Sequence, residues 1–366
     1  MRIGILTLPL HINYGGILQA YALQTVLERM GHEVKVIDKN LLPPKANWLY
    51  IYPKRIFLKY ILHKNIPVFH EKLMYENYSM RTKYILPFIE KYIARKIIYD
   101  VSEIKKDEFD VIIFGSDQIW RPKYYCQFYK RIIDAFGAFA YKWNINLISY
   151  AASFGLDNLN EFNKKEIIKI KECIQKFNGV SVRESQAIYL CKIFFNVNAI
   201  HVLDPTMLLN KGDYISLISP DIVQRNGIMQ YILDLDTEKQ KIVKSICQCM
   251  KMPLFSCIHY SETCQPAVEQ WLAGFRDASI IITDSFHACV FSIIFHKPFI
   301  VIENPQRGLS RIKSLLGIFN LQHHLITNIN QIKPLEYYKL NEDVYKILSD
   351  WQIKSFKFLN SSLVLK

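Results

Sequence analysis

A histidine is expected at the start of a buried helix in the segment ASIIITDSFHACVFSII (278–294). The residues before Asp284 are short or β-branched, as in a buried strand, and from Phe286 onward apolar residues recur at the spacing of one helical face. The first turn of a helix leaves backbone N–H groups unpaired and attracts negative charge. Asp284 or Ser285 can cap this helix, so His287 is expected at a position that binds anions.

A carboxylate follows a second apolar run, VIIFGSDQIW (111–120), which ends in Ser116 and Asp117. In an open parallel sheet, ligands bind outside the carboxyl ends of the strands. Asp117 can therefore accept hydrogen bonds from sugar hydroxyls or act as a base, and Trp120 can stack on a sugar ring. The alternative reading is structural, with Asp117 as a helix cap and Trp120 as a core aromatic.

Two further strand ends carry polar groups. INLISYAASFG (145–155) places Ser153 after a strand, and GVSVRE (179–184) places Arg183 at the end of another. An arginine is unusual at a dry strand end unless it meets a carboxylate or a phosphate. Arg183 is therefore expected to contact either an anionic ligand or a carboxylate of the protein, which would be Glu184 or a residue of a neighbouring helix.

The turn HINYGG (11–16) joins the first expected strand to a helix that ends near Gly31. Gly15 and Gly16 allow backbone N–H groups to approach a ligand, as in a phosphate-binding loop, although the spacing matches neither the dinucleotide nor the Walker pattern. This turn could contact a ligand, or it could serve only as a tight connection between strand and helix, and the sequence favours neither role.

These segments belong to an alternation of strands and helices that predicts an α/β fold of two Rossmann-like, doubly wound domains. A chain of 366 residues is long for one hydrophobic core. Residues 205–227 lack clear periodicity, so the domain connection is placed there. The expected units are residues 1–210, with a basic and aromatic helical insertion at about 41–105, residues 211–340, and a helical tail, 341–366, that could cross back to the first domain.

The chain carries 46 Lys and Arg against 33 Asp and Glu, a formal net charge of +13. This excess favours acidic partners such as phosphorylated small molecules, anionic lipid or nucleic acid. Residues 51–100 hold ten of the basic and four of the acidic residues, mixed with Tyr and Phe. That segment could bind a membrane surface or nucleic acid, but a solvated helical insertion is the preferred interpretation, and no nucleic-acid partner is expected.

The apolar start RIGILTLPL gives way at once to HINYGG, so no signal peptide is expected and the protein is placed in the cytoplasm. No apolar run is long enough to predict a membrane span. The eight cysteines lack paired CxxC spacing, which indicates a reducing compartment and no structural metal. Neither a metal nor a cofactor is expected.

The motifs, taken together and in order, resemble the polysaccharide pyruvyl transferase family. They are GILTLPLHINYGGILQAYALQ, FGSDQIW, SYAASFG, SVRE, LDPT and TDSFH followed by FSIIFHKPF, and they span roughly residues 1–320. The resemblance implies a glycosyltransferase-B-like pair of Rossmann-type domains. It also implies transfer of pyruvate from phosphoenolpyruvate to a nucleotide- or lipid-linked sugar of a surface polysaccharide, forming a ketal and releasing phosphate.

The resemblance also implies roles for the residues singled out above. His287 is expected as general acid or phosphate ligand and Asp117 as base. The donor-binding side is expected to include Arg183, Ser285, Phe286, Arg307 and Arg311, and the acceptor-binding side Asn13, Tyr14, Gly15, Gly16, Gln19, Ser116, Trp120 and Ser153. Relatives carry an arginine where this chain has Ser285, so either Arg183, Arg307 or Arg311 replaces that charge, or the donor is a different molecule.

Two other functions remain open at this stage. One is a glycosyltransferase of the same shape that uses a nucleotide sugar, for which Glu269, Glu303 or Asp284 would have to hold a ribose or sugar. The other is a non-catalytic protein that binds an anionic glycan through its basic middle segment. Separately, the same segment could give the enzyme a peripheral contact with an anionic membrane, at the inner face of the cytoplasmic membrane.

Overall fold

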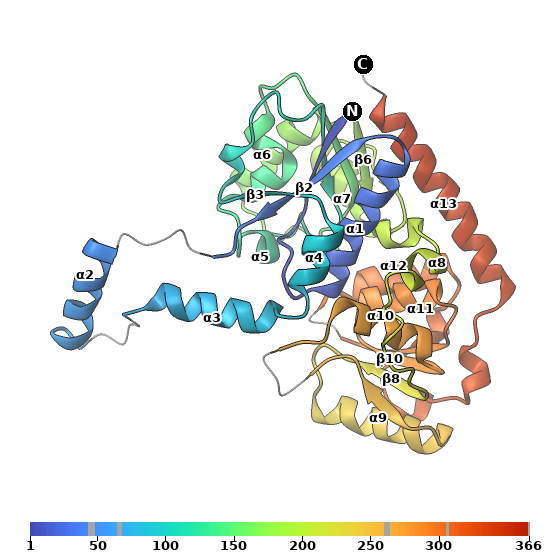
Figure 1. Ribbon diagram of the computed structural model, residues 1–366. Helices are drawn as coiled ribbons and strands as arrows, with labels where there is room; N and C mark the ends of the chain where they lie inside the picture. Colours follow the sequence, from blue (N-terminus) through green and yellow to red (C-terminus); the bar gives the residue numbers. More distant parts are fainter. Residues whose placement is uncertain (43–47, 64–67, 260–263, 305–306, 365–366) are drawn as a thin grey trace.

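Two parallel β-sheets, one from each half of the chain, form the framework of the protein (Figure 1). The computed structural model describes residues 1–42, 48–63, 68–259, 264–304 and 307–364. Strands of parallel sheets are covered by helices on both faces and therefore read as continuous apolar runs. All residues of the strands Val111–Gly115 and Ile280–Thr283 are buried in this way. The predicted α/β fold with parallel sheets in two domains is confirmed.

The first sheet has seven strands in the order β3-β2-β1-β4-β5-β6-β7. They are β1 (Arg2–Leu6), β2 (Glu33–Lys39), β3 (Arg95–Ile98), β4 (Val111–Gly115), β5 (Asn146–Ala152), β6 (Gly179–Val182) and β7 (Ile200–His201). Its helices are α1 (Tyr14–Arg29), α5 (Pro122–Tyr125), α6 (Lys164–Ile174) and α7 (Ser185–Phe195). The strand order reverses between β1 and β4, so the loops after these two strands flank the point where ligands bind in such sheets.

The second sheet has five strands in the order β12-β11-β10-β8-β9. They are β8 (Ile228–Tyr231), β9 (Leu254–Ser256), β10 (Ile280–Thr283), β11 (Phe299–Ile302) and β12 (Leu325–Ile326). The helices of this half are α8 (Lys211–Ile215), α9 (Thr237–Met250), α10 (Val268–Asp277), α11 (Phe286–Ile294) and α12 (Leu309–Ile318). Here the order reverses between β8 and β10, and the segment TDSFH follows β10.

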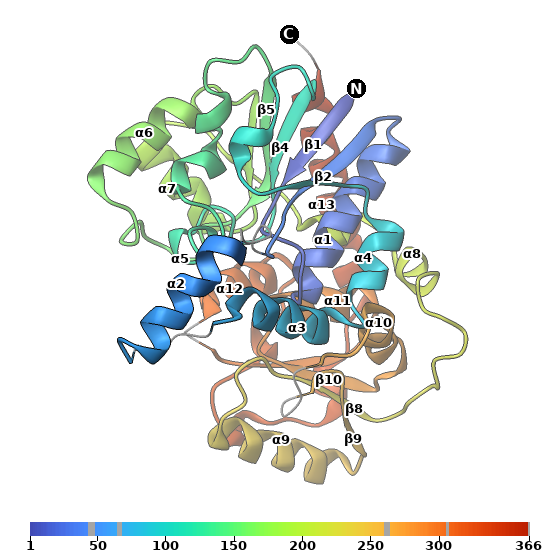
Figure 2. The same cartoon turned by 60° about the vertical axis from the view of Figure 1, so that its left-hand side comes forward.

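The basic segment between β2 and β4 contains the helices α2 (Trp48–Tyr60), α3 (His70–Thr82) and α4 (Leu86–Tyr92), and then β3. β3 pairs with β2 as the edge strand of the first sheet, and α4 packs on α1 through Tyr21 and Phe88, whose rings are 6.0 Å apart. Only α2 and α3 project from the body of the molecule (Figures 1 and 2). This part of the chain therefore combines a projecting unit with two elements of the first domain.

The final helix, α13 (Glu342–Leu363), runs from the second domain back along the first sheet (Figure 1). The Leu203 backbone N–H donates to Ser355 Oγ (3.0 Å), and Asn146 Nδ2 donates to the Ser362 carbonyl (3.0 Å). Gly179 leaves room for this contact, since a Cβ there would lie 2.2 Å from Ser362 Oγ. None of the helices in the described ranges has the length and apolarity needed to cross a membrane.

Leu359→Ala tests whether α13 stabilises the first domain. Leu359 is fully buried in the core, so we expect its truncation to lower the free energy of unfolding by about 2–5 kcal/mol. Denaturant unfolding monitored by circular dichroism measures this. Ile353→Ala on the same helix is the control, because Ile353 is 65% exposed and should change stability by less than about 0.5 kcal/mol. Equal effects of the two substitutions would show that α13 is not docked.

Candidate active site

A cavity of about 430 Å³ lies where the carboxyl ends of the two sheets meet. The first domain lines it with the loops after β1 and β4, and the second domain with the loops after β8, β10 and β11. These loops include both points of strand-order reversal. Of the residues to which the resemblance assigns a role, eleven line the cavity: Asn13, Tyr14, Gly15, Gly16, Gln19, Asp117, Ser285, Phe286, His287, Arg307 and Arg311.

Two helices begin at this cavity without a side-chain cap. Asn13 is the N-cap of α1 and Ser285 the N-cap of α11, and neither side chain accepts a hydrogen bond from the first turn of its helix. The residues of both first turns line the cavity. Because the leading N–H groups of a helix lack intrahelical acceptors, two sets of backbone donors and two positive dipole ends lie at one cavity. This arrangement favours a ligand with more than one negative group.

His287 lies between the two helix starts because α1 has a glycine at its second position. A Cβ at Gly15 would be 2.0 Å from His287 Nδ1, so only glycine leaves space for the ring. His287 is 7% exposed and lines the cavity. Its Nε2 is 3.6 Å from Asp204 Oδ2, longer than a hydrogen bond, and has no hydrogen-bond partner among the described residues. This nitrogen is buried beside the Asp204 carboxylate, whereas the residue as a whole lines the cavity.

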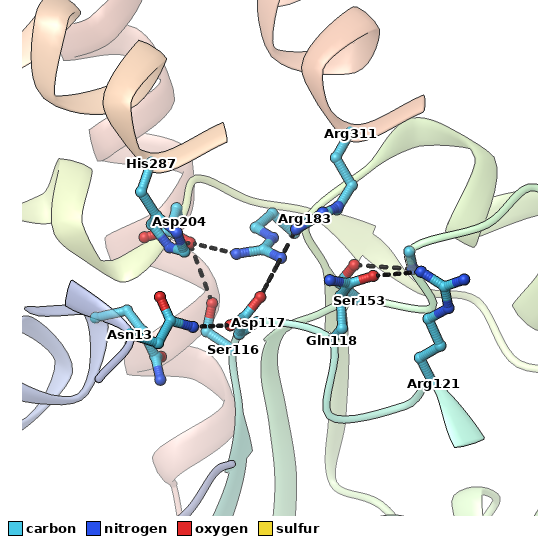
Figure 3. A network of polar contacts seen from close by, with 12 residues as sticks. Asn13, Ser116, Asp117, Gln118, Arg121, Ser153, Arg183, Asp204, His287 and Arg311 are labelled. Carbon is cyan, nitrogen blue, oxygen red and sulfur yellow. Dashed lines mark hydrogen bonds and ion pairs between the residues drawn. The ribbon is translucent and has the colours of Figure 1, made fainter. Parts of the chain in front are cut away.

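A buried ion network lies directly behind the histidine (Figure 3). Arg183 donates from Nη2 to Asp117 Oδ1 (3.1 Å) and from Nη1 to Asp204 Oδ2 (2.9 Å). Asn13 Nδ2 donates to Asp117 Oδ2 (3.2 Å), which explains why its side chain does not cap α1. The network thus joins the ends of β4, β6 and β7 to the first turn of α1.

Burial and charge act against each other in this network. Burial works against ionisation of Asp204, but His287 and Arg183 outweigh it and hold the pKa of the carboxyl below its usual value. The same balance lowers the pKa of Asp117, where Arg183 is the strongest of the cations that oppose burial. Both carboxylates are therefore charged at neutral pH and fix the position of Arg183.

Arg311 supplies a second buried guanidinium, and this one reaches the cavity. Its Nη1 is 3.7 Å from Asp117 Oδ1, its Nη2 donates to the Arg307 carbonyl, and its Nε has no hydrogen-bond partner among the described residues. Burial, and then the charge of Arg183, lower the pKa of Arg311 to about 10, so it stays protonated at neutral pH. Arg311 is the best-placed cation for an anion in the cavity.

Arg307 also lines the cavity but is already paired. Its Nε and Nη2 donate to the two carboxylate oxygens of Asp234 at 2.6 and 2.8 Å. The side chain is 40% exposed, so this pair lies at the rim. A ligand anion would have to compete with Asp234 for the guanidinium of Arg307.

Asp284 is neither the cap of α11 nor free to hold a sugar. Its carboxylate accepts from the Leu233 N–H (2.6 Å), Lys239 Nζ (2.7 Å) and Asn304 Nδ2 (2.8 Å), and the residue is 1% exposed. Asp284 therefore ties the loops after β8 and β11 to the end of β10. Its function is to hold the second domain's side of the cavity in place.

Four of the residues singled out from the sequence lie behind the cavity wall. Trp120 is fully buried, stacks on Phe136 and donates from Nε1 to the Ala135 carbonyl, so the expectation that it stacks on a sugar is wrong and it is a core aromatic. The expected acceptor contacts of Ser116 and Ser153 are wrong for the same reason: both are fully buried, and their hydroxyls donate to Asp204 (3.3 Å) and Glu184 (3.0 Å).

Arg183 is the fourth. Its side chain is 1% exposed and does not line the cavity, so it does not contact a donor directly. Its partners are carboxylates of the protein, as one of the two sequence readings allowed, but they are Asp117 and Asp204 rather than Glu184. The guanidinium also lies 4.5 Å from the centre of the Phe286 ring, so it supports the start of α11 from behind.

Tyr14 and Gln19 line the cavity but also have structural partners. Tyr14 stacks on Trp271 at 5.4 Å and donates its hydroxyl to the Pro266 carbonyl (2.6 Å), so it connects the two domains. Gln19 Nε2 donates to Thr7 Oγ1 (2.8 Å), while its Oε1 has no partner in the described part of the chain. Gln19 is 1% exposed, so its main role in the described structure is to fix Thr7 beside the cavity wall.

Asp204 is the residue of the network that the site prediction omitted. It follows β7 in the sequence LDPT, and its position after an apolar run was the available signal. Gln118, Tyr124 and Gln127 on the loop after β4 also line the cavity and were not predicted. Asp117 itself has a left-handed backbone (φ 54°), a conformation that costs energy and is found at functional sites.

Known proteins resemble this chain in family and in fold. A family model described as polysaccharide pyruvyl transferase matches residues 13–306. No curated protein matches the sequence. The described residues contain no group of three or more His, Cys, Asp or Glu side chains placed to hold a metal ion.

Among solved structures, a putative UDP-N-acetylglucosamine 2-epimerase from Listeria monocytogenes matches with 10% identity and a TM-score of 0.50, covering 99% of this chain and 90% of its own. UDP-GlcNAc 2-epimerase from Methanocaldococcus jannaschii has 13% identity, a TM-score of 0.45, and coverages of 95% and 92%. MurG from Acinetobacter baumannii has 11% identity, a TM-score of 0.41, and coverages of 97% and 94%. The likeness concerns the fold, and the glycosyltransferase-B-like architecture is confirmed.

Proposed function

Because the chain belongs to the polysaccharide pyruvyl transferase family, we propose that it transfers pyruvate from phosphoenolpyruvate to a sugar of a surface polysaccharide precursor, forming a ketal and releasing phosphate. One observation carries the proposal: two uncapped helix N-termini and the guanidinium of Arg311 surround His287 in a single cavity. The phosphate and the carboxylate of phosphoenolpyruvate are attached to the same carbon atom. The cavity offers separate donors for each.

Arg311 supports a phosphoenolpyruvate donor although Ser285 occupies the position of the family's arginine. Arg311 lines the same cavity and has an unpartnered Nε among the described residues. Ser285 is 6% exposed, and its backbone N–H donates to Thr283 Oγ1 (3.0 Å). Its hydroxyl can donate a further hydrogen bond to the anion. Arg311 then provides the charge and α11 the backbone donors.

The reaction requires one proton donor and one proton acceptor. The methylene carbon of phosphoenolpyruvate takes a proton and becomes the methyl group, while a sugar hydroxyl attacks the neighbouring carbon and gives up its proton. A second sugar hydroxyl then attacks the same carbon, the bond from this carbon to the phosphate oxygen breaks, and the hydroxyl proton leaves with the phosphate. The product is a cyclic ketal and inorganic phosphate.

His287 and Asp117 are the groups we assign to these proton transfers. The imidazole of His287, which lines the cavity, can deliver the proton to the methylene carbon or stabilise the departing phosphate. Asp117 lines the cavity and is ionised, so it can accept the hydroxyl proton. Asp204 has the role of a positioning residue, since it lies behind His287 and holds Arg183.

Amide and aromatic side chains on the first domain's side of the cavity fit a sugar acceptor. Gln118, Tyr124 and Gln127 line it together with Phe128. Amides donate and accept hydrogen bonds to hydroxyls, and aromatic rings stack on the apolar faces of sugars. The acceptor class we propose is therefore a nucleotide- or lipid-linked sugar with a neighbouring pair of free hydroxyls, met in the cytoplasm.

The test is incubation of the protein with phosphoenolpyruvate and a series of sugar intermediates, with phosphate release and the mass of the acceptor as readouts. We expect stoichiometric phosphate release and the mass of one ketal-bound pyruvyl unit on the acceptor. Thermal-shift titration with each donor distinguishes our proposal from the alternative of a glycosyltransferase, because a ligand that binds the native state raises the melting temperature. Stabilisation by nucleotide sugars and not by phosphoenolpyruvate would replace our proposal with that alternative.

Gly15→Ala tests the placement of the histidine. The new Cβ would lie 2.0 Å from His287 Nδ1 and must displace the ring, while alanine suits a helix better than glycine. A displacement of this size is expected to reduce phosphate release on the order of 100-fold, with a loss of stability of about 1–3 kcal/mol from overpacking the buried ring. Gly317→Ala in α12 is the control, since the nearest atom to a Cβ there is 4.0 Å away. Full activity of Gly15→Ala would mean that the ring position is not needed.

A further inference from the structure

The helices α2 and α3 project from the two-domain body (Figures 1 and 2). We refer to residues 48–63 and 68–84 as the arm. In both views α3 lies at the height of the boundary between the two domains, which is also where the cavity lies. The described residues of the arm are absent from the cavity lining. The arm therefore has no part in the chemistry proposed above.

The arm exposes large apolar side chains that a solvated helix would bury or lack. Tyr50 and Phe57 are 76% and 53% exposed and lie seven residues apart on one face of α2, and Ile61, directly after the helix, is 62% exposed. Further exposed apolar side chains of the arm are Ile56, Tyr60, Leu62, Phe69, Leu73, Tyr75, Met80 and Tyr84. Large apolar side chains exposed in this number on a projecting element mark an interaction site.

The charge of the arm is positive. The sequence of α2, WLYIYPKRIFLKY, has Lys54, Arg55 and Lys59 and no acidic residue. Lys59 lies over the Tyr60 ring at 5.6 Å, so a cation and an exposed aromatic side chain are neighbours on its surface. Apolar and aromatic side chains beside lysines are the composition of helices that lie in the interface of an anionic membrane.

The arm is attached to the wall of the cavity. It leads into α4, and Gln24 of α1 donates from Nε2 to the Tyr92 carbonyl (3.2 Å) at the end of α4. α1 in turn carries the loop from Asn13 to Gly16 at its start. His11 lines the cavity, and Arg81 lies near it at the end of α3. Burial, and then the charge of Arg81, lower the pKa of the His11 imidazole to about 4.

We propose that the arm docks onto an anionic phospholipid membrane through the apolar face of α2 and its lysines, and so holds the cavity close to the lipid surface. Nucleic acid fits this surface less well, because Ile56, Ile61 and Leu62 offer neither charge to phosphates nor rings to bases. Where the acceptor is lipid-linked, docking brings its sugar to the cavity. That consequence rests on the proposed function, whereas the docking itself does not.

Flotation of the full chain with vesicles tests the docking without any substrate. The vesicles are phosphatidylcholine alone or phosphatidylcholine mixed with phosphatidylglycerol, at low and at high salt. We expect binding to the anionic vesicles only, weakened by salt because the attraction is screened. The variant Lys54→Glu/Lys59→Glu should bind at least roughly tenfold more weakly, since each basic residue near the surface contributes to binding. Tyr50→Ser/Phe57→Ser/Ile61→Ser should also release the protein.

The matched control is Ile168→Ser/Tyr189→Ser/Ile193→Ser on α6 and α7, whose side chains are 63%, 66% and 58% exposed outside the arm. This variant should float as the wild type does. Equal binding of the arm variants and the wild type, or equal binding to neutral vesicles, overturns the proposal. Light scattering that shows a dimer in the wild type and a monomer in the arm variants also overturns it, in favour of a second copy as the partner.

The arm variants also separate this proposal from the proposed function. With phosphoenolpyruvate and a water-soluble sugar acceptor, they should release phosphate at the wild-type rate, because the arm residues lie outside the cavity. Lost flotation with retained phosphate release supports docking as a separate property. Flotation that persists in a protein that releases no phosphate would leave the docking intact and contradict the enzymatic proposal alone.

Discussion

Replacing Arg183 with methionine is expected to lower the free energy of unfolding by about 3–5 kcal/mol at pH 7. Arg183 is 1% exposed and is hydrogen-bonded to both Asp117 and Asp204, which are themselves buried. Methionine matches the volume of the side chain but leaves two buried carboxylates without their cation. Removing one partner of a buried ion network lowers stability by more than the intact network adds to it, because water cannot solvate the charges that remain.

The pH dependence identifies the carboxylates as the cause. In the wild type the pKa values of Asp117 and Asp204 are lowered, so their contribution to stability is present above their unfolded values near ~3.9 and is lost as the pH falls through the folded values. Without Arg183, His287 and, for Asp117, Arg311 are the cations that would still oppose the effect of burial, so both pKa values should rise relative to the wild type. The variant should then gain stability relative to the wild type as the pH falls from 7 to about 4.5.

Denaturant unfolding at several pH values measures both effects. Arg307→Met is the control, because the Arg307–Asp234 pair is about half exposed and such pairs contribute less than about 1 kcal/mol. A difference between Arg183→Met and the wild type that did not shrink on acidification would assign the loss to packing. It would also contradict the role of the buried carboxylates.

The second large effect is expected for His287→Gln, which should reduce the rate of phosphate release about 10²–10⁴-fold. Glutamine can place an amide near the position of Nε2 and keep a hydrogen bond to an anion, but it cannot transfer a proton. We therefore expect kcat to fall while KM for phosphoenolpyruvate changes little. His287 lines the cavity beside Gly15, so no other residue in the network takes its place.

The control for this substitution is His323→Gln, since His323 is exposed and lies outside the cavity. It should leave both kcat and KM unchanged. A rise in KM with an unchanged kcat for His287→Gln would assign the imidazole to binding of the donor alone. A fully active variant would remove His287 from the mechanism.

The strand-ends of the fold could be predicted because parallel sheets leave a strong pattern in sequence. Each buried strand is a short apolar run, and the polar residue that follows it must lie at the edge where ligands bind. His287 and Asp117 were found in this way, and both line the cavity. The turn at Gly15 was also visible, but its purpose, to leave room for the His287 ring, depends on a contact between domains.

What could not be predicted depends on the order of strands in space. Arg183 follows β6, and its partners follow β4 and β7, which only the order β4-β5-β6-β7 brings together. Trp120 illustrates the same limit, because a tryptophan after a strand end can face a ligand or the core. The loop after β4 turns it inward onto Phe136.

The role of Arg307 depended on a partner that sequence reading did not connect with it. Asp234 lies after β8 in the second domain, more than seventy positions earlier, and pairs with the Nε and Nη2 edge of the guanidinium. Arg311, one helical turn further on, has no such partner on its Nε among the described residues. Which of two neighbouring arginines is available to an anion is therefore a tertiary property.

The most direct measurement is a crystal structure of the protein with phosphoenolpyruvate. The account predicts that the molecule lies between the first turns of α1 and α11, with one anionic group beside the His287 imidazole and another near the guanidinium of Arg311. Phosphoenolpyruvate bound outside this cavity, or bound in it with its phosphate and carboxylate turned away from both helix starts, would contradict the account.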